Sequence, residues 1–216
     1  NLLATSGKRK LSIKIIYSVY PMATLAISHE QIGCYLKNNR KVATSKVGLG
    51  GGCHWCTEGV FASLNGIVKI NQGWISSTGT NTQFSEAIEV YFEPDVISLI
   101  DLISIHLHTH ACTSEHSMRN KYRSAVYTYS DEQAEQSDAI LRELQPDFEE
   151  SIITKVLPYQ EFKANKIELT DYLYSAPSRP FCQQYIHPKL QLLIQRFSKH
   201  VNYEKLVTAG IEFTRN

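Results

Sequence analysis

Two cysteines, Cys53 and Cys56, follow three glycines at residues 50–52 and form the segment best suited to chemistry. Residues 46–49 predict a short strand before the glycines, and residues 54–64 predict an amphipathic helix after them. Glycine permits positive φ and a close approach of the backbone to a substrate. The free N–H groups and the dipole of an opening helical turn stabilise a thiolate over a thiol. We therefore predict that Cys53 is a nucleophile.

The spacing of Cys53 and Cys56, C-x-x-C, is found in redox pairs and in halves of zinc sites. The sequence has no second C-x-x-C. Imidazole and thiolate groups further along could complete a zinc site, but alternate residues of a helix point in different directions. These histidines also fall near a predicted helix end, where cationic side chains commonly lie. We therefore predict a solvated helix end and no metal site; the residues concerned are His106, His108, His110, His116 and Cys112.

The composition is that of an ordinary globular protein. The chain has 216 residues, of which 22 are basic and 21 acidic, so the net charge is +1. This length suits one domain with a full core. The charge balance argues against nucleic acid or an anionic membrane as a partner, and no stretch approaches the roughly 20 apolar residues of a membrane span. Five cysteines, an odd number, suit a reducing compartment, so we predict a cytoplasmic monomer.

The chain divides into an N-terminal arm, residues 1–44, and a domain over residues 45–216. Alternating strand and helix patterns fill most of the domain. We predict strands at 46–49, 67–74, 86–92, 123–129 and 152–157, and helices at 54–64, at 96–108, from 130 onward and at 189–197. This order predicts an α+β fold, a two-layer split βαβ (ferredoxin-like) sandwich with a loop-rich C-terminal extension.

Four segments resemble, in the same order, those of a known family. The letters GGCHWCTEGVF at 51–61, followed by LNG at 64–66, resemble the active-site stretch of the peptide methionine sulfoxide reductase A (MsrA) family. Three later segments agree with it: FSEAIEV at 84–90 with EP at 93–94, TH at 109–110, and YRSAVY at 122–127, which resembles the family's Q-Y-R-S strand. The resemblance covers residues 46–173 and implies that residues 45–216 are an MsrA-like catalytic domain.

The resemblance implies a role for each matching residue. Cys53 would attack the sulfur of methionine S-sulfoxide, free or in a peptide, and end as a sulfenic acid while methionine is released. Glu86 would protonate the departing oxygen, assisted by the Tyr122 hydroxyl. His54 and Trp55 would bind the substrate, with Trp55 against its S-methyl group. We expect an apolar pocket around Glu86, formed against Trp55, because such a pocket favours a protonated acid.

Turnover requires a second thiol to resolve the sulfenic acid as a disulfide, which thioredoxin can then reduce. We favour Cys182, on a C-terminal segment expected to be mobile, over Cys56, which is one helical turn after Cys53. Cys34 and Cys112 are predicted to be structural. No cofactor is expected.

The sequence also departs from the family. The family usually has phenylalanine where this chain has His54, and a tyrosine in an N-P-T-Y segment that is missing from the loop between residues 73 and 86. An acid usually five residues before the Tyr122 position is Ser117. His54 would make one wall of the methyl pocket polar, and the other two changes remove polar substrate contacts. We therefore predict a shifted substrate preference. Glu58 is expected on the helix surface, where it would complement the dipole.

Two alternatives remain open at this point. A thioredoxin-like thiol-disulfide oxidoreductase would use Cys53 and Cys56 as its pair, and would depend on Cys56 rather than on Glu86. A degenerate family member would bind methionine-containing peptides without turning them over.

Overall fold

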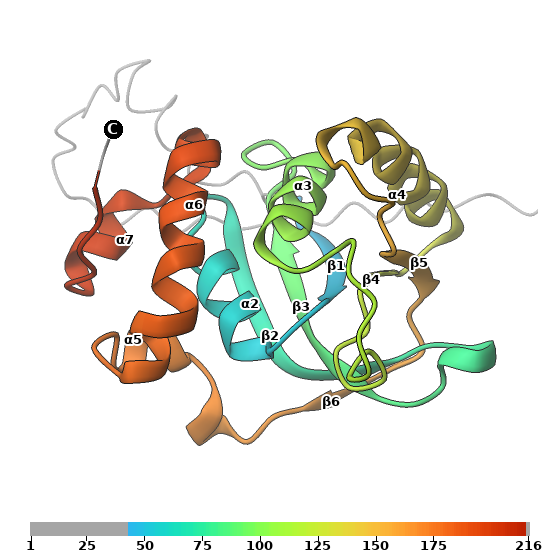
Figure 1. Ribbon diagram of the computed structural model, residues 1–216, viewed down its shortest axis with the longest axis horizontal. Helices are drawn as coiled ribbons and strands as arrows, with labels where there is room; N and C mark the ends of the chain where they lie inside the picture. Colours follow the sequence, from blue (N-terminus) through green and yellow to red (C-terminus); the bar gives the residue numbers. More distant parts are fainter. Residues whose placement is uncertain (1–42, 215–216) are drawn as a thin grey trace, which may run out of the picture. The chain divides into compact units, whose positions relative to one another are not determined.

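The computed structural model describes residues 43–214, and Figure 1 shows the order of its strands and helices. In this range six strands form one sheet in the order β5-β4-β1-β3-β2-β6. Their bounds are β1 Ser45–Gly50, β2 Ile67–Ser76, β3 Ser85–Phe92, β4 Ala125–Thr128, β5 Lys155–Pro158 and β6 Glu161–Ala164. The predicted N-terminal arm lies outside the described residues except for its last two positions.

Two strand–helix–strand units interleave to make the centre of the sheet. The first is β1, helix α2 (His54–Phe61) and β2, and the second is β3, helix α3 (Leu99–Thr109) and β4. Strand β3 lies between β1 and β2, while β1 lies between β3 and β4, and all of these contacts are antiparallel. Strand β5 extends the sheet in parallel with β4. The predicted α+β class is confirmed.

The C-terminal part holds more regular structure than the predicted loop-rich extension. Besides α4 (Asp131–Leu144) and α6 (His187–Phe197), it contains elements that the sequence pattern did not reveal: β6, α5 (Tyr172–Ser175), a π-helical turn (Cys182–Ile186) and α7 (Tyr203–Thr208). Each spans four to six residues, too few for a periodic pattern to show. Short 3₁₀ turns cover Gly79–Asn81, Gln145–Asp147, Ile167–Leu169 and Ser198–His200.

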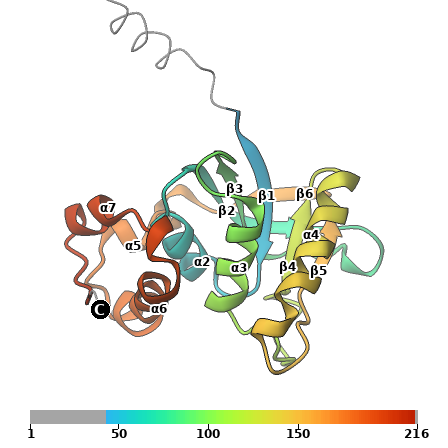
Figure 2. The same ribbon diagram turned by 90° about the horizontal axis from the view of Figure 1, so that it is seen from above.

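Figure 2 shows α5, α6 and α7 grouped beside α2, at the end of the sheet away from α4. No helix in the described part of the chain is both long and apolar enough to cross a membrane.

Strand β3 carries one candidate catalytic side chain into the helical layer. Its Ile88, Val90 and Phe92 belong to the main core, whereas Ala87 belongs to a smaller cluster with Tyr127. Side chains of a strand alternate between the two faces of a sheet. Glu86 therefore shares the face of Ile88 and points toward the side on which α2 packs.

Serine side chains set the first residues of two helices. The Ser98 hydroxyl accepts a hydrogen bond from the Asp101 N–H (3.3 Å), which delays the start of α3 to Leu99 instead of residue 96. The Ser130 hydroxyl accepts one from the Gln133 N–H (3.1 Å), which confirms the predicted start of α4.

Candidate active site

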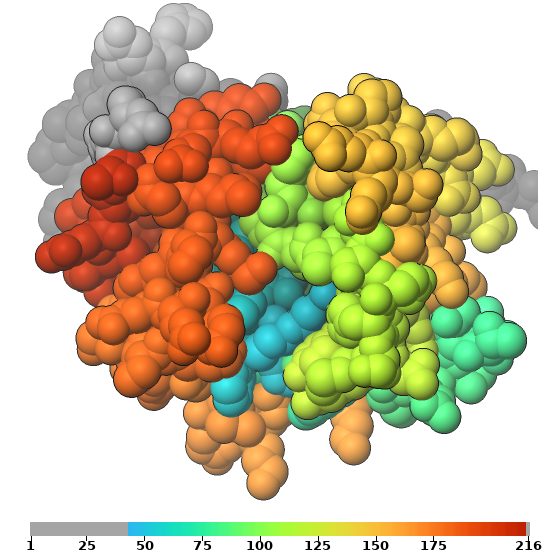
Figure 3. All heavy atoms as spheres, in the orientation of Figure 1, coloured from blue at the N-terminus to red at the C-terminus, as the bar shows by residue number. Residues whose placement is uncertain are grey.

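Cys53 is the N-cap residue of α2, at the junction of strand and helix that the sequence predicts. Its backbone is not yet helical, with φ −58° and ψ 126°. Its carbonyl oxygen accepts hydrogen bonds from the N–H groups of Cys56 (3.0 Å) and Thr57 (3.2 Å), which closes the first helical turn. The side chain is half-buried. Figure 3 shows the start of α2, in blue, in a recess between the orange C-terminal helices and the yellow-green loop before β4.

A hydrogen bond from the Cys56 thiol to Cys53 makes the two thiols unequal. It lowers the pKa of Cys53 to about 7, and the backbone N–H of Trp55 acts in the same direction. Burial and the negative charge of Glu86 oppose this effect. The same hydrogen bond, together with burial, raises the pKa of Cys56. Cys53 therefore ionises near neutral pH, while Cys56 remains a thiol that donates to it.

The glycines before Cys53 are needed for close packing and not for positive φ, which they do not adopt. A Cβ on Gly51 would lie 2.5 Å from the His110 ring, and one on Gly50 would lie 2.9 Å from a backbone oxygen. Gly52 faces open space. The expectation of positive φ is therefore wrong, and the close approach is to the protein's own His110.

The predicted solvated helix end is wrong for all three of its histidines. The His108 side chain is 4% exposed and packs against Phe148, with ring centroids 4.7 Å apart. His106 is 1% exposed and donates from Nε2 to the Gly50 carbonyl oxygen (2.9 Å). His110 stacks on His106 with ring centroids 4.1 Å apart, and its Nδ1 lies 2.6 Å from the His106 carbonyl oxygen. Burial lowers the pKa of His106 to about 4 and that of His110 well below its usual value, so both rings are neutral at pH 7. They brace the glycine loop behind Cys53.

The same region contains the histidines and the cysteine that could complete a zinc site. Among residues 43–214, no three His, Cys, Asp or Glu side chains come together in a way that could hold a metal ion.

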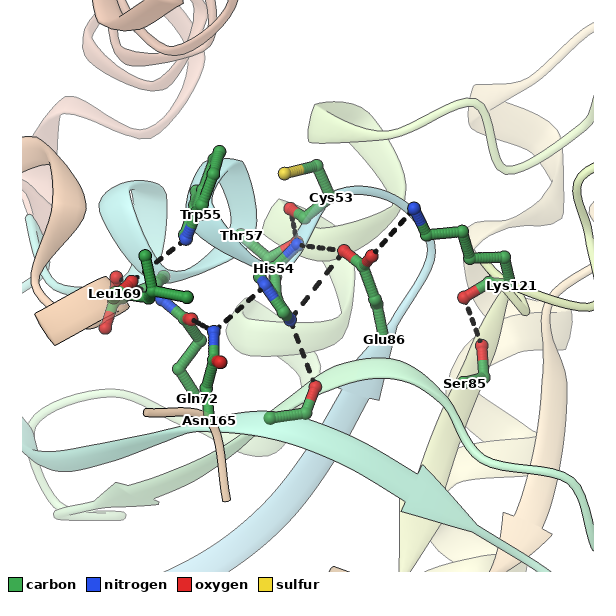
Figure 4. A network of polar contacts seen from close by, with 12 residues as sticks. Cys53, His54, Trp55, Thr57, Gln72, Ser85, Glu86, Lys121, Asn165 and Leu169 are labelled. Carbon is green, nitrogen blue, oxygen red and sulfur yellow. Dashed lines mark hydrogen bonds and ion pairs between the residues drawn. The ribbon is translucent and has the colours of Figure 1, made fainter. Parts of the chain in front are cut away.

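Glu86 sits 6% exposed at the start of β3, facing the first residue of α2. Its Oε2 accepts a hydrogen bond from the His54 backbone N–H (3.2 Å), and its Oε1 lies 3.4 Å from the Lys121 ammonium. Figure 4 shows both contacts beneath the Cys53 sulfur. The expected apolar pocket against Trp55 is wrong: the carboxylate faces polar donors, and its cross-strand neighbour is Trp74.

Lys121 is a site residue that the sequence reasoning missed. Its backbone carbonyl oxygen accepts hydrogen bonds from the Glu86 N–H and the Ser85 hydroxyl, both 2.9 Å long, which fix it at the start of β3. Its ammonium lies 4.9 Å from the centre of the Tyr122 ring. Lys121 occupies the place of the glutamine in the family's Q-Y-R-S strand. A charged residue directly before Tyr122 was therefore the feature of the sequence that could have identified Lys121 as a site residue.

The His54 ring points into the protein, toward the sheet. Its Nδ1 donates to the Gly73 carbonyl oxygen (3.2 Å), and its Nε2 accepts from the Asn165 side-chain amide (3.3 Å). The Trp74 ring meets it edge-on, with centroids 5.2 Å apart. Burial lowers the pKa of His54, although the Glu86 charge opposes the shift, so the ring is neutral at pH 7. His54 thus lies under the predicted substrate site, beside Glu86.

The Trp55 ring is held in an aromatic stack at the edge of the recess. It lies parallel to Tyr172 with centroids 4.2 Å apart and meets Phe181 edge-on at 5.5 Å. Its Nε1 donates to the Leu169 carbonyl oxygen (2.9 Å). The ring remains half-exposed, so it is available as a rigid apolar wall.

Glu58 is 6% exposed, so the expectation that it lies on the helix surface is wrong. Its carboxylate accepts hydrogen bonds from the backbone N–H groups of Asp171 (2.9 Å) and Tyr172 (3.2 Å) and from the Gln72 amide (2.6 Å). Asp171 adopts φ 52°, a left-handed conformation that is uncommon for this residue. Glu58 therefore anchors the segment that carries Tyr172 against Trp55.

Cys182 lies in the π-helical turn before α6 and is 0% exposed, not on a mobile loop as expected. Burial raises its pKa, with the Arg179 charge opposing. Its thiol faces the Ala176 carbonyl oxygen at 3.7 Å, and it lies within electrostatic reach of Cys56. Cys112 is also buried, and burial raises its pKa to about 11, as suits a structural cysteine. Cys34 lies outside the described residues.

Lys189 of α6 is a second charged residue that the sequence reasoning missed. Its ammonium donates to the Thr109 carbonyl oxygen at the end of α3. Burial lowers the pKa of Lys189, and the charges of Cys56 and Cys53 oppose this shift. A half-buried cation therefore faces the two thiols from the C-terminal side.

Comparison with known proteins places the chain in a family. The sequence profile described as "Peptide methionine sulfoxide reductase" matches residues 45–202. The peptide methionine sulfoxide reductase MsrA of Thermus thermophilus is 34% identical over 158 residues, which are 66% of this chain and 89% of the relative. That of Pasteurella multocida is 34% identical over 160 residues, 68% of this chain and 92% of the relative.

Solved structures agree with these sequence relatives. Mxr1 from Saccharomyces cerevisiae in an unusual oxidized form matches with a TM-score of 0.53 and 26% identity, over 62% of this chain and 83% of that one. Methionine sulfoxide reductase A of Corynebacterium diphtheriae has the same fold, with a TM-score of 0.56 at 22% identity over 64% of this chain and 77% of that one. With the profile covering most of the domain, the chain belongs to the peptide methionine sulfoxide reductase family.

Proposed function

We propose that this protein reduces methionine S-sulfoxide to methionine with Cys53 as the nucleophile. The observation that carries the proposal is the placement of Cys53, whose pKa is lowered to about 7, at a helix N-terminus beside the carboxyl group of Glu86. A sulfoxide reductase needs a sulfur nucleophile and an adjacent acid. Family membership supports this combination over a thiol-disulfide exchange enzyme, for which Glu86 has no use.

The first step consumes one thiolate and one proton. The Cys53 thiolate attacks the electrophilic sulfur of the sulfoxide, a proton goes to the oxygen, and the oxygen ends on Cys53. The products are the Cys53 sulfenic acid and methionine, so Cys53 is oxidised and the substrate sulfur is reduced. Glu86 is the proposed proton donor, Tyr122 the proposed second donor, and the half-exposed Trp55 ring the surface for the S-methyl group.

Lys121 is the proposed replacement for the oxygen-side tyrosine that the family carries and this chain lacks. Its ammonium lies 3.4 Å from Glu86 Oε1, so an oxygen bound at Glu86 also meets the positive charge. A donor aimed at developing negative charge stabilises the transition state. With three ammonium hydrogens, Lys121 can contact Glu86 and the substrate oxygen together.

Two further thiols, Cys56 and Cys182, act one after the other to resolve the Cys53 sulfenic acid. Cys56 already contacts the Cys53 sulfur, so it forms the first disulfide and releases water. Cys182, within electrostatic reach of Cys56, then attacks it and frees the Cys53 thiolate, leaving a Cys56–Cys182 disulfide. A dithiol protein of the thioredoxin class is the proposed reductant of that bond. The four free cysteines in the described part of the chain support a reducing compartment, for which we propose the cytoplasm.

The test is a single turnover without external reductant. Pre-reduced protein is mixed with the S and R epimers of N-acetyl-methionine sulfoxide, and both the methionine product and the remaining thiols are counted. The S epimer is expected to give about two products per chain with the loss of three thiols, Cys56 and Cys182 as a disulfide and Cys53 as a sulfenic acid, and Cys53→Ser none. Absence of product with the wild-type chain, or equal product with Cys53→Ser, would overturn the proposal.

A further inference from the structure

A hollow of about 620 Å³ lies beside the candidate active site. It is bordered by Trp74 of β2, by Phe84 just before β3, and by five residues at the end of β6 and after it: Lys163, Ala164, Asn165, Lys166 and Leu169. The mechanism above uses none of these side chains. We refer to this hollow as the flank pocket.

The flank pocket adjoins the reacting groups on two sides. Trp74 is the cross-strand partner of Glu86 and packs edge-on against the His54 ring at 5.2 Å. Leu169, at the other side, accepts the hydrogen bond from Trp55 Nε1 at 2.9 Å. Figure 4 shows Leu169 and Asn165 beyond the rings of Trp55 and His54 as seen from Glu86. A substrate held at Glu86 and Trp55 therefore has the flank pocket next to it.

The walls of the flank pocket combine apolar and cationic side chains. Phe84 is 38% exposed and Leu169 39% exposed, although both are large apolar residues. Lys163 and Lys166 are exposed beside them, and within the described part of the chain neither forms an ion pair. No acidic side chain lines the pocket. Its chemistry therefore complements apolar groups and carboxylates.

We propose that the flank pocket binds the polypeptide residues next to an oxidised methionine, and that it favours apolar and acidic side chains there. The inference rests on the proposed function and names its substrate class, a methionine sulfoxide within a polypeptide of this character. A volume of this size is in the range that holds drug-sized ligands, roughly 300–1,000 Å³, and so exceeds the needs of one sulfoxide group. Exposed apolar side chains next to cations, close to a reactive group, form such a subsite.

Charge complementarity predicts whether the flank pocket prefers acidic or basic flanking residues. Two lysines at the pocket repel a basic flank and attract an acidic one, and the effect on binding weakens as salt screens it. A free amino acid carries no flanking residues and cannot use the pocket. The ratio of peptide to free substrate therefore reports on the flank pocket, while the turnover of the free substrate reports on the chemistry.

The experiment compares three heptapeptides, each with a central methionine S-sulfoxide, with N-acetyl-methionine S-sulfoxide. The flanks are Leu and Asp, Leu and Lys, or Gly and Ser, and dithiothreitol serves as the reductant so that recycling by a protein plays no part. For the wild-type chain we expect kcat/KM to be about tenfold higher with the acidic flank than with the basic one, since two partly exposed charge contacts each contribute modestly. Raising the salt concentration should shrink this ratio.

Variants test whether the preference for acidic over basic flanks arises from the flank pocket. Lys163→Glu with Lys166→Glu should invert the preference between acidic and basic flanks and change the free substrate by less than about twofold. Lys69→Glu with Arg142→Glu, two exposed sites away from the pocket, makes the same change in net charge and should leave the preference intact. Phe84→Ser should reduce the advantage of leucine flanks over glycine and serine.

Binding is measured separately, so that the pocket is tested even without turnover. Fluorescence anisotropy of a labelled acidic-flank peptide on the Cys53→Ser full chain should show weaker binding when Lys163 and Lys166 are also reversed. The inference is overturned if the wild type shows no flank preference, or if the two double variants change all substrates alike. Failure of the free substrate to react, with peptide binding retained, would instead contradict the proposed function.

Discussion

Cys53 and Cys182 lie in two regions that prepare a thiol in opposite ways. Cys53 is half-buried at the start of α2, accepts a hydrogen bond from Cys56 and has its pKa lowered to about 7. Cys182 is fully buried in a π-helical turn, and burial raises its pKa. The first region holds a half-buried thiol that ionises near neutral pH, and the second holds a thiol away from solvent.

For the proposed reaction, this difference means that attack is preorganised and that recycling requires motion. The Glu86 carboxyl group already contacts the His54 N–H and the Lys121 ammonium, and Cys53 already accepts a hydrogen bond from Cys56. A buried Cys182 cannot meet a protein reductant until the turn that carries it opens. Segments with π-helical geometry frequently occur at functional sites, in keeping with such a role.

We expect the largest effect from removing the acid of the region around Cys53. Glu86→Gln keeps an acceptor for the His54 N–H but has no acidic proton, so the single-turnover rate should fall by about 10²–10⁴-fold. Rapid quenching with measurement of methionine gives the rate. Glu89→Gln is the matched control, because Glu89 is buried at 4% exposure on the same strand but faces the other side of the sheet. Equal losses in both variants would mean that the effect is structural.

Cys182→Ser should leave attack intact and weaken only recycling. Without reductant, the wild-type chain should release about two methionines, because exchange with Cys182 frees Cys53 once more, whereas Cys182→Ser should release about one. Steady-state turnover with thioredoxin should fall at least about tenfold. Cys112→Ser, another buried cysteine, is the control and should behave as the wild type. Two methionines from Cys182→Ser would contradict the proposed order of thiols.

The sequence predicted the region around Cys53 better than the C-terminal region around Cys182. The glycine run, Cys53 and the patterns on either side predicted the strand–helix junction, because this depends on local periodicity. Glu86 was identified through the resemblance to the family and not through the pattern of its strand. Lys121 was missed because its role depends on a contact across the fold, between a loop and the start of β3. The burial of Glu58 was missed for the same reason, since its partners lie 113 and 114 residues away in the chain.

The C-terminal region was the less predictable one. Its helical turns are only four to six residues long, and packing, not intrinsic periodicity, decides that they form. Proline-bounded sequence around Cys182 therefore appeared to be a loop. The departure at His54 predicted a polar wall for the substrate, whereas the ring is turned toward Gly73 and Asn165.

Lys121→Gln restores the residue type of the family's Q-Y-R-S strand and tests the charge beside Glu86. We expect the single-turnover rate to fall about tenfold, or about 1.4 kcal/mol of transition-state stabilisation, with KM changed little. Lys121→Arg should recover most of the rate because it keeps a cationic donor. Lys69→Gln, an exposed lysine elsewhere on the sheet, should have no effect. If glutamine and arginine slow the reaction equally, the charge is not what matters.

The smallest effect concerns the hydrogen bond that makes Cys53 acidic. In the wild type the fraction of Cys53 thiolate, which is the attacking form, should rise with pH through about 7 and then level. Cys56→Ala removes the main cause of the lowered pKa, so the pKa of Cys53 should return toward its ordinary value of about 8.5. Thiolate at pH 7 then falls about 16-fold, but a more basic thiolate is about fivefold more nucleophilic, so the net loss is about threefold.

Because the loss of thiolate and the gain in nucleophilicity oppose each other, the pH–rate profiles of the wild type and of Cys56→Ala should cross. At pH 9.5 both thiols are largely ionised, and the alanine variant should be about fourfold faster than the wild type in single-turnover experiments. Thiol titration by ultraviolet absorbance gives the two pKa values independently of rate. A variant that is slower at every pH by one constant factor would show that Cys56 positions the Cys53 side chain without setting its charge. Crossing profiles would show that the hydrogen bond exchanges nucleophilic strength for availability of the thiolate at neutral pH.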